Sequence, residues 1–459
     1  MENIVINSLT ALSALIQTIP NASTEASLES PTRSPRRASS VRRMEHILTT
    51  PHSLQLQQLG RSETSQSAQL SNKDFLLRNY SDVAISTDLE PDDVEALRLI
   101  FAEANRLYQQ SPGSKYPINL IIVGEGNTAI KKLRMEKLMA TYFDLPPGVE
   151  IRVVEGKATK GNLFPYDGLE LFSEKEMKAI PFPEEGREKQ AIAALEAWAK
   201  ASKKPFLIQL KPASELLSLD KEAAKKMTVF FYGSFNFRQT VLDAKELEGL
   251  IDYFSQHFEK IGIIESFGVL GKEPSISWEF PWSHKIATRI LESKEPYFVM
   301  FREFCHFWNR YSVEMFLEGS AKTIEKLLET HPKEQGLKEI SANIQALQQE
   351  LSLGRIKELK AQVFEPKNPE LKKLPGWGGL ERRVGLVDKI ASSPIQFTLA
   401  DILVAMAVRE DGHRLFQATP IKATYNAEGF LISKPDPTSN VVYYGPAKHE
   451  EVANYLEHN

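Results

Sequence analysis

Four carboxylates stand within six residues where a predicted strand passes into a predicted helix. The segment "DLEPDD" contributes Asp88, Glu90, Asp92 and Asp93. The apolar "VAIST" precedes it, and "VEALRLIFAEA" follows with the apolar spacing of a helix. Crowded carboxylates raise one another's pKa values unless a cation neutralises them. Calcium and magnesium take oxygen ligands, and no Cys or His stands nearby, so the turn favours Ca²⁺ or Mg²⁺ over Zn²⁺.

A purely structural explanation is available for part of this turn. Asp92 and Asp93 fall in the first turn of the predicted helix, where the helix dipole favours acidic side chains. Pro91 also suits the first position of a helix. Asp88 is different, because charge repulsion should discourage a further carboxylate at the tip of the strand. From the pattern alone, a metal site and a capped helix start both remain open.

The elements that must position these residues alternate along the chain. Short apolar strands are predicted at 83–87, 118–127, 149–156, 205–210, 227–233 and 260–270, with helices between them. This alternation predicts an α/β fold with a mostly parallel central sheet and helices on both faces. Ligands bind beyond the carboxyl ends of such strands. Asp88 and Asn127 stand at the ends of two predicted strands, and Ser214 follows another, so all three should gather along one edge of the sheet.

The second half of the chain is predicted to be mainly helical. Helices dominate from 283 to 361, and the Gly-containing segment 374–384 is expected to interrupt them. A helix is predicted over 398–410, with Thr398 as its cap. The segment 420–445 alternates like antiparallel strands, and 448–458 closes the chain as a helix.

The first 78 residues differ from the rest and are predicted to be a disordered tail, because they are rich in Ser, Thr and Gln. Within "RSPRRASSVRR", Arg36 and Arg37 precede Ser39 as basophilic kinases prefer. A phosphate on Ser39 would suit a phosphoserine-binding host protein. The alternative is a solvated basic tail. One folded domain is expected from 79 to 459.

Composition excludes several classes of protein. A net charge of -4 offers no general field for nucleic acid. The single cysteine, Cys305, excludes an internal disulfide framework. No apolar run reaches the roughly 18 residues of a membrane span, and no signal-peptide pattern opens the chain. We therefore expect a cytoplasmic protein, or one secreted into a host cell without a classical signal peptide, and the oligomeric state stays open. No dinucleotide-binding or P-loop glycine motif is present.

Several motifs in the same order resemble those of nucleoside hydrolases, the calcium-dependent N-ribohydrolase family. "TDLEPDD" resembles the family's acidic turn, and "GEGNT" its Gly-Asn element. "FLIQLKPASELLSL" resembles its strand and Pro-containing turn. "SWEFPWSHKIATRIL" is similar to its Glu-Phe-Asn segment, and "TLADILVAMAV" to its late Asp-containing helix. The resemblance covers about residues 79 to 459.

The resemblance implies a Rossmann-like nucleoside hydrolase fold that cleaves the N-glycosidic bond of a nucleoside or another ribosyl compound. It also implies a calcium ion as cofactor, with four ligands: Asp88, Asp93, Asp401 and the carbonyl oxygen of Ser214. Asp88 would in addition accept the proton of the attacking water. Three residues would bind the hydroxyl groups of the sugar: Asp92, Asn127 and Glu279.

Departures from the family pattern point to a divergent branch that includes bacterial effector proteins. Pro281 replaces an Asn that contacts the sugar, and Ala400 replaces a His that assists the departing base in some members. The acid that would protonate the leaving group is therefore open, and each of its three candidates has a structural role as the favoured explanation: Tyr166, His284 and His413. The alternative function is an effector that binds a ribosyl ligand or a host protein without turnover.

Overall fold

The computed structural model describes residues 73–158, 168, 170–183, 186–233, 244–264, 289–355, 369–374, 376–392, 400–425, 431–445 and 449–458. The chain divides into two compact units, and each is described here by itself. The α/β unit takes its described residues from 18–158, 183–278 and 398–459. The helical unit takes its described residues from 159–182 and 279–397.

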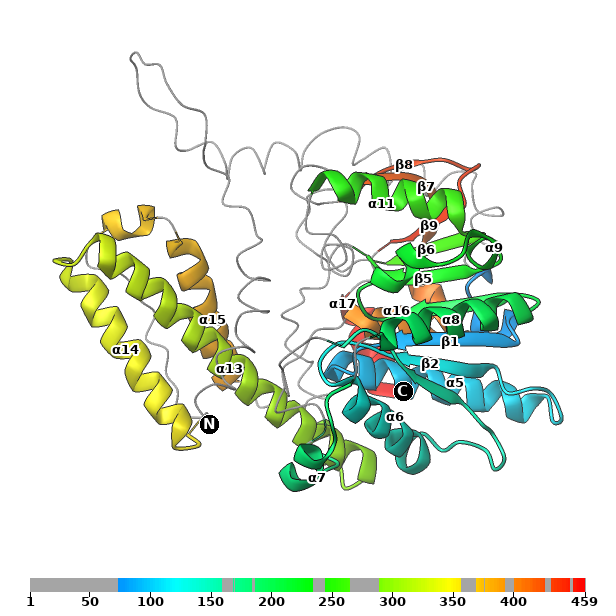
Figure 1. Ribbon diagram of the computed structural model, residues 1–459, viewed down its shortest axis with the longest axis horizontal. Coiled ribbons are helices and arrows are strands. Elements are labelled where there is room, and N and C mark those ends of the chain that lie inside the picture. The colour runs from blue at the N-terminus through cyan, green and yellow to red at the C-terminus, as the bar shows by residue number, and fades with distance from the viewer. Residues whose placement is uncertain are drawn as a thin grey trace, which may run out of the picture. The chain divides into compact units, whose positions relative to one another are not determined.

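The described part of the α/β unit is built on a nine-stranded sheet with the order β3-β2-β1-β4-β5-β6-β9-β7-β8 (Figure 1). Neighbouring strands from β3 to β9 are parallel, and β7 and β8 are antiparallel additions at one edge. The prediction of a mostly parallel sheet is confirmed. The strands are β1 (Asp82–Thr87), β2 (Ile118–Val123), β3 (Arg152–Glu155), β4 (Pro205–Gln209), β5 (Thr228–Tyr232), β6 (Lys260–Ile264), β7 (Ala418–Tyr425), β8 (Leu431–Pro435) and β9 (Val441–Tyr444).

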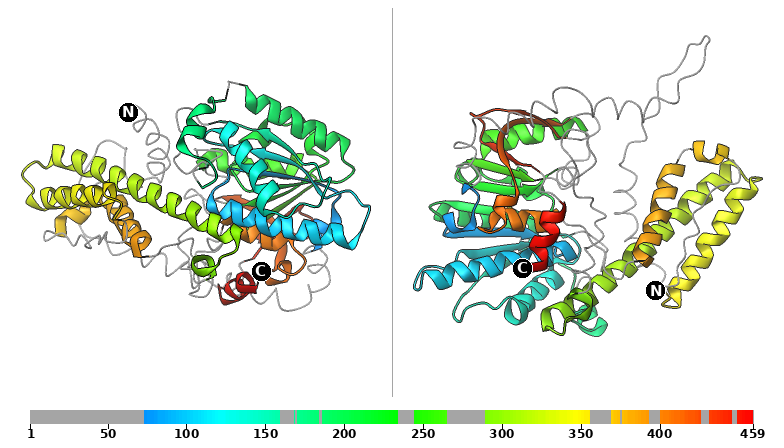
Figure 2. Two further views of the ribbon diagram at one scale, coloured as in Figure 1. Left: turned by 90° about the horizontal axis from the view of Figure 1, so that it is seen from below. Right: turned by 180° about the vertical axis from the view of Figure 1, so that it is seen from behind.

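Helices cover both faces of this sheet, which explains why its central strands are apolar on both sides. On one face, α8 (Arg187–Ala201), α9 (Lys221–Ala224) and α11 (Ala244–His257) pack on the strands through one apolar cluster. Within that cluster, Val229 and Phe231 of β5 face the same side, as the two-residue period of a strand requires. Helices α8 and α5 (Pro91–Gln110) lie on opposite sides of the sheet (Figure 2).

Helix α16 (Ala400–Val408) packs against both α5 and strand β5. Its nine residues, "ADILVAMAV", include only one charged side chain, and every residue from Asp401 to Val408 is buried. A helix that is apolar all round belongs inside a protein. Residues 393–399, including the predicted cap Thr398, lie outside the described residues, and the first turn of α16 as described delivers Asp401 to the interior.

The described part of the α/β unit also contains two further helices and three 3-10 turns. They are η1 (Leu77–Asn79), α6 (Thr128–Tyr142), η2 (Ser214–Ser218), η5 (His413–Leu415) and α17 (His449–His458). Between β4 and β5 the chain forms η2 and α9 in place of one continuous helix, because Asp220 caps a new helix by accepting from the Glu222 backbone N–H at 3.3 Å.

Ordered packing begins before residue 79. The ring of Phe75 is fully buried and lies 5.2 Å from the ring of Phe230 and 5.8 Å from that of Tyr444, measured between centroids. Phe75, Leu76 and Leu77 therefore contribute to the core of the α/β unit.

The helical unit contains α7 (Glu174–Ala179), α13 (Pro296–Thr330), α14 (Gln335–Ser352), η4 (Pro369–Lys373) and α15 (Trp377–Ser392). The prediction that 374–384 interrupts the helices is wrong, because α15 begins at Trp377. Glycines destabilise a helix interior by about 1 kcal/mol each, but Trp377, Leu380 and Val384 are buried at helical spacing in a core shared with α13 and α14. Among the described helices of the chain, none has the length and apolarity needed to cross a membrane.

Candidate metal centre

The acidic turn joins β1 to α5 and is held by hydrogen bonds to its own side chains. The hydroxyl of Thr87, the last residue of β1, donates to the Asp93 carboxylate and accepts from the Leu89 backbone N–H at 3.0 Å. The backbone N–H of Glu90 donates to the second Asp93 oxygen at 3.2 Å. The Asp93 carboxylate therefore accepts a hydrogen bond from a backbone N–H at the start of α5 and stays inside the turn.

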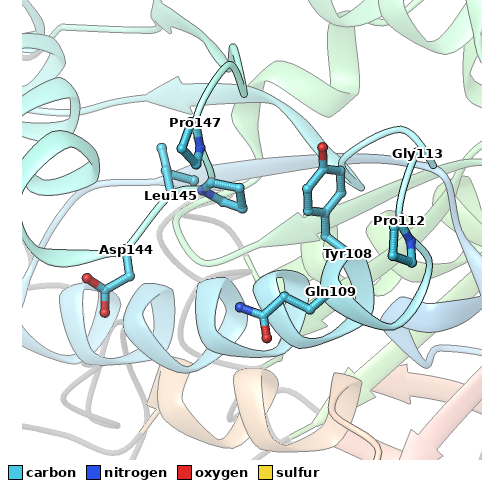
Figure 3. A pocket seen from close by; sticks show the side chains of 8 residues that line it. Tyr108, Gln109, Pro112, Gly113, Asp144, Leu145 and Pro147 are labelled. Carbon is cyan, nitrogen blue, oxygen red and sulfur yellow. The ribbon is translucent and has the colours of Figure 1, made fainter.

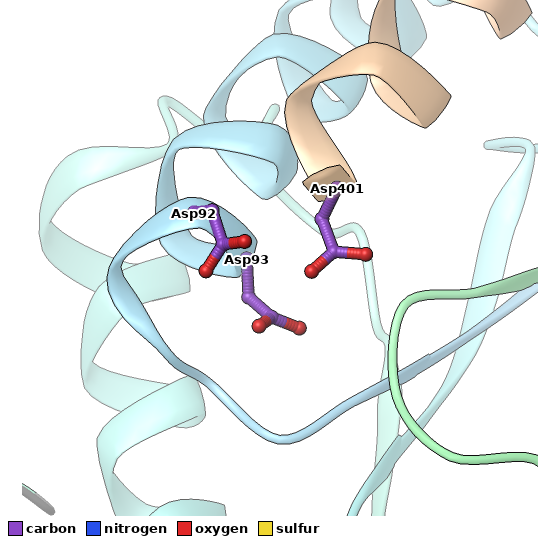
Figure 4. Close-up of side chains that lie close together, drawn as sticks. All are labelled: Asp92, Asp93 and Asp401. Atoms are coloured by element: carbon purple, nitrogen blue, oxygen red, sulfur yellow. The ribbon is translucent and has the colours of Figure 1, made fainter. Parts of the chain in front are cut away.

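Three carboxylates meet where α5 and α16 begin. One ligand oxygen from each of Asp92, Asp93 and Asp401 lies within 4.8 Å of the others (Figure 4). All three side chains are buried, with exposed fractions of 5%, 1% and 5%. Asp401 comes from a helix more than 300 residues further along the chain, so only the packing of α16 on α5 creates the cluster.

Asp88 stands beside this cluster rather than within it. Its carboxyl is hydrogen-bonded to that of Asp93, and its charge raises the pKa values of both Asp93 and Asp401. Burial is the largest cause of both raised pKa values, and the neighbouring carboxylates add to it. Four buried carboxyl groups so close together are costly unless they share protons or hold a cation.

The cluster fits a hard dication. Within the part of the chain that the structure describes, the Asp401 Oδ1 atom is buried and has no hydrogen-bond partner. An oxygen in that state has lost its hydration without compensation. All candidate ligands are oxygens, which suits Ca²⁺ or Mg²⁺. The family resemblance assigned Asp92 to the substrate and Asp88 to the metal, whereas the structure places Asp92 within the cluster and Asp88 beside it.

Asn127 serves as the N-cap of α6. Its Oδ1 atom accepts from the backbone N–H groups of Ala129 and Ile130 at 3.1 and 3.2 Å, and the side chain is almost fully buried. Because the cap occupies Oδ1, a contact with a ligand would come from the amide N–H groups.

The turn that carries Ser214 follows β4, which is paired with β1 in the sheet. A buried ion pair between Lys211 and Glu215 brackets this turn. The side-chain amide of Gln209 donates to the carbonyl oxygens of Lys211 and Pro212, at 2.7 and 3.1 Å. These contacts fix the backbone of the turn at the same edge of the sheet as Asp88.

Of the remaining predicted residues, only His413 is among those that the structure describes. Glu279 and Ser39 lie outside the described residues, as do Tyr166 and His284. His413 is described, but it follows the far end of α16 from Asp401, and its Nδ1 atom lies 2.7 Å from the carbonyl oxygen of Glu410.

Two cations on α6 are residues that sequence reasoning missed. The Lys131 ammonium donates to the backbone carbonyl of Asp88, and Arg134 Nη1 donates to that of Leu89 at 2.8 Å. Both side chains are buried. Their three-residue spacing, which places them on one face of a helix, was the available signal.

Glu125 was also missed, although it follows β2 at the same edge of the sheet. It adopts a left-handed backbone conformation with φ 59, and its pKa is raised to about 7 by burial first and then by Asp88. The Lys131 and Lys211 ammonium groups act in the opposite direction on that pKa. A glutamate placed between two glycines at a strand end was the signal in the sequence.

A separate surface pocket of about 400 Å³ lies at the other end of α5 (Figure 3). Tyr108, Pro112 and Pro147 give it an apolar wall, and Asp144 is its one carboxylate. Because α5 is 20 residues long, about 30 Å separate this pocket from the acidic turn. The carboxylate cluster and this pocket are therefore different sites.

Comparison with solved structures finds proteins of the predicted kind. The chain is similar to an inosine-uridine preferring nucleoside hydrolase from Bacillus anthracis, with 10% identity and a TM-score of 0.40 over 82% of this chain and 98% of that one. It is also similar to the effector protein XOO4466, with 12% identity and a TM-score of 0.40 over 86% and 97% of the two chains.

A third similar structure is the type III effector protein XopQ complexed with adenosine diphosphate ribose, with 13% identity and a TM-score of 0.40 over 86% and 97%. No family model and no curated protein matches the chain.

Proposed function

We propose that this protein is a calcium-dependent hydrolase of the N-glycosidic bond of a nucleoside or a related ribosyl compound. The observation that carries the proposal is the buried group of Asp92, Asp93 and Asp401, with Asp88 beside it and one Asp401 oxygen without a hydrogen-bond partner among the described residues. Carboxylates buried at this cost suit a function better than a scaffold.

In this proposal the metal would be held by Asp88, Asp93, Asp401 and the carbonyl oxygen of Ser214. A calcium ion there would lower the pKa of a bound water. The chain itself supplies the base, because the Asp88 carboxylate accepts the proton of the attacking water. Asp92, Asn127 and Glu279 hold the sugar hydroxyls and so orient the anomeric carbon.

Asp401 supports the proposal because a carboxylate is not needed for packing at this position. It is the single charged residue in an apolar, buried helix. An apolar residue there would avoid the cost of burying a carboxylate without a hydrogen-bond partner for one oxygen. Its presence beside Asp92 and Asp93 is therefore best explained by a ligand.

A second candidate function is a binding protein that keeps the ribosyl pocket without turnover. Ala400, immediately before Asp401, favours it, because a methyl group offers no proton to a departing base. Acid assistance is commonly worth about 10² to 10⁴-fold in rate.

If the protein is a hydrolase, the same residue predicts its substrate preference. Hydrolysis should be faster with p-nitrophenyl riboside, whose leaving group needs no proton, than with inosine.

The test compares inosine and p-nitrophenyl riboside as substrates, with calcium and with EGTA. We expect calcium-dependent hydrolysis by the wild type and a loss of about 10²-fold or more in Asp88→Asn, which removes the base. Asp388→Asn, an exposed site on α15, is the matched control and should retain full activity. A wild type that binds ribose with calcium but hydrolyses neither substrate would support the binding protein instead.

A further inference from the structure

Helix α6 carries two buried cations on the face that meets the acidic turn. Lys131 and Arg134 follow the N-cap Asn127 by four and seven residues, so all three share one face of the helix. The exposed fractions of the two cations are 2% and 0%. A buried cation is costly unless it makes hydrogen bonds. These two residues therefore need a role that an apolar side chain could not fill.

Each cation holds a backbone carbonyl of the acidic turn. The Lys131 ammonium donates to the carbonyl of Asp88, and Arg134 Nη1 donates to that of Leu89 at 2.8 Å. Hydrogen bonds from charged donors are stronger than those between neutral groups. Because both acceptors are backbone atoms of consecutive residues, these contacts fix the course of the chain through the turn.

Leu89 adopts a backbone conformation that needs such support. Its φ is 55, in the left-handed region that residues other than glycine rarely adopt. Its N–H donates to the Thr87 hydroxyl at 3.0 Å, and its carbonyl accepts from Arg134. Both backbone polar groups of this fully buried residue are therefore paired in the left-handed conformation. Strained backbone persists only where its surroundings hold it in this way, and it gathers at functional sites.

The conformation of Leu89 determines where the carboxylates of the turn lie. Because the chain bends at this residue, the Asp93 carboxylate can accept from the Thr87 hydroxyl at the end of β1. In that arrangement Asp92 and Asp93 each present an oxygen within 4.8 Å of one from Asp401. The geometry of the metal cluster therefore depends on the backbone that α6 holds.

We propose that Lys131 and Arg134 are positioning residues that hold the acidic turn in its ligand-binding conformation before a calcium ion binds. This inference rests on the calcium site of the proposed function. Neither cation can favour a dication by its charge, because like charges repel. Their contribution is the position of the backbone that carries Asp88, Asp92 and Asp93. Groups that orient metal ligands are commonly worth about 10 to 100-fold in metal affinity.

The experiment measures calcium affinity of the full chain by isothermal titration calorimetry, at a temperature where circular dichroism shows each variant folded. Arg134→Met removes both the donor and the charge, whereas Arg134→Lys keeps a charged donor. We expect Arg134→Met to bind calcium about 10 to 100-fold more weakly than the wild type, and Arg134→Lys to recover most of the loss. Charge alone predicts the opposite order, because the Met variant lacks a cation that repels the ion. Lys131→Met and Lys131→Arg form an independent second pair if an Arg134 variant does not fold.

A second readout uses the protein without metal. In EGTA, the backbone N–H groups of Leu89 and Glu90 should be protected from hydrogen exchange in the wild type, because they donate to side chains of the turn. Arg134→Met should exchange faster at these amides, with no change in strands β4 and β5. The matched control is Lys137→Met, which removes an exposed cation from the same helix and should behave as the wild type in both readouts.

The outcomes separate this role from the proposed function. Arg134→Met binding calcium at least as tightly as Arg134→Lys would overturn the positioning role and leave the calcium site standing. Weaker binding together with faster exchange throughout the sheet would assign the residues to general stability, and it would also overturn the role. A wild type that binds no calcium overturns both this inference and the calcium-dependent function. The expected affinities and exchange, in a protein that hydrolyses no riboside, would support the positioning role while the hydrolase function fails.

Discussion

The Lys131 ammonium on α6 donates to the backbone carbonyl of Asp88, 43 residues earlier in the chain. One turn further along α6, Arg134 holds the carbonyl of Leu89, which has a left-handed backbone with φ 55. These two hydrogen bonds hold the backbone of the acidic turn against α6. The Lys131 charge also lowers the pKa of Glu90, which burial and neighbouring carboxylates raise. One cation therefore offsets only part of the negative charge at this edge.

The first prediction concerns the metal. Calcium that binds only the native state stabilises it by RT ln(1 + [L]/Kd), about 2.7 kcal/mol at a hundredfold excess over Kd. Asp401→Asn should lose most of that gain, because it removes one charged ligand, and should be more stable than the wild type without calcium. Thermal unfolding with and without calcium measures both effects. Asp252→Asn, exposed on α11, is the control. An unchanged calcium response in Asp401→Asn would refute the assignment.

The second prediction is a dependence of stability on pH that reverses with calcium. Burial first, and then like charges, raise the pKa values of Asp93 and Asp401 above their ordinary range. Between the unfolded value near about 4 and the raised native value, the native state holds more protons than the unfolded chain. Without metal, stability should therefore fall as the pH rises from about 4 through the raised native pKa values of these two carboxyl groups.

Calcium requires the ionised carboxylates, so its stabilising effect should grow over the same range. Asp411 and Asp436 have lowered pKa values and titrate below this window, so they do not mask the slope. Melting temperatures in EGTA and in calcium provide the measurement. Stability that climbs with pH in EGTA would contradict the prediction.

The third prediction tests the turn that carries Ser214. A Cβ atom on Gly124 would lie 2.6 Å from Lys211 Cε and 2.8 Å from Cδ. Gly124→Ala should therefore push Lys211 away from Glu215, destabilise the protein by about 1–3 kcal/mol and weaken calcium binding. Gly385→Ala, in α15 with open space around it, should instead be neutral or stabilising by up to about 1 kcal/mol. Equal effects of the two substitutions would show that the Lys211 contact is unimportant.

The fourth prediction concerns the boundary of the folded region. From composition, residues 1–78 are expected to be a disordered tail. Limited proteolysis should remove about 70 residues and stop near Phe75, whose ring packs in the core. Mass spectrometry of the resistant fragment locates the cut. Early cleavage within 205–233, between β4 and β5, would argue against a folded region of this extent.

The fifth prediction concerns Ser39, which follows Arg36 and Arg37. Phosphorylation there should allow a phosphoserine-binding host protein to bind the tail, because phosphate oxygens pair with arginines in such pockets. Binding of phosphorylated full-length protein to a purified phosphoserine-binding protein is the measurement, with Ser40→Ala as the matched control. Binding that persists unchanged in Ser39→Ala would reject this site.

The sequence by itself determined the alternation of strands and helices and the acidic turn. Both depend on local order: apolar runs punctuated by turns, and Asp88, Asp92 and Asp93 within a few residues of one another. Local order could not show that α15 begins at Trp377, because burial of its apolar face outweighs the local cost of two glycines.

Only the tertiary structure decided how Asp401 and Lys131 meet the turn. Asp401 reaches Asp92 and Asp93 because α16 packs on α5, and Lys131 reaches the Asp88 carbonyl because α6 packs on β2, the neighbour of β1, and on β3. The raised pKa of Glu125 likewise arises from burial and from charges on three separate elements. Desolvation and Coulomb interactions depend on distance in space, which the order of residues along the chain does not specify.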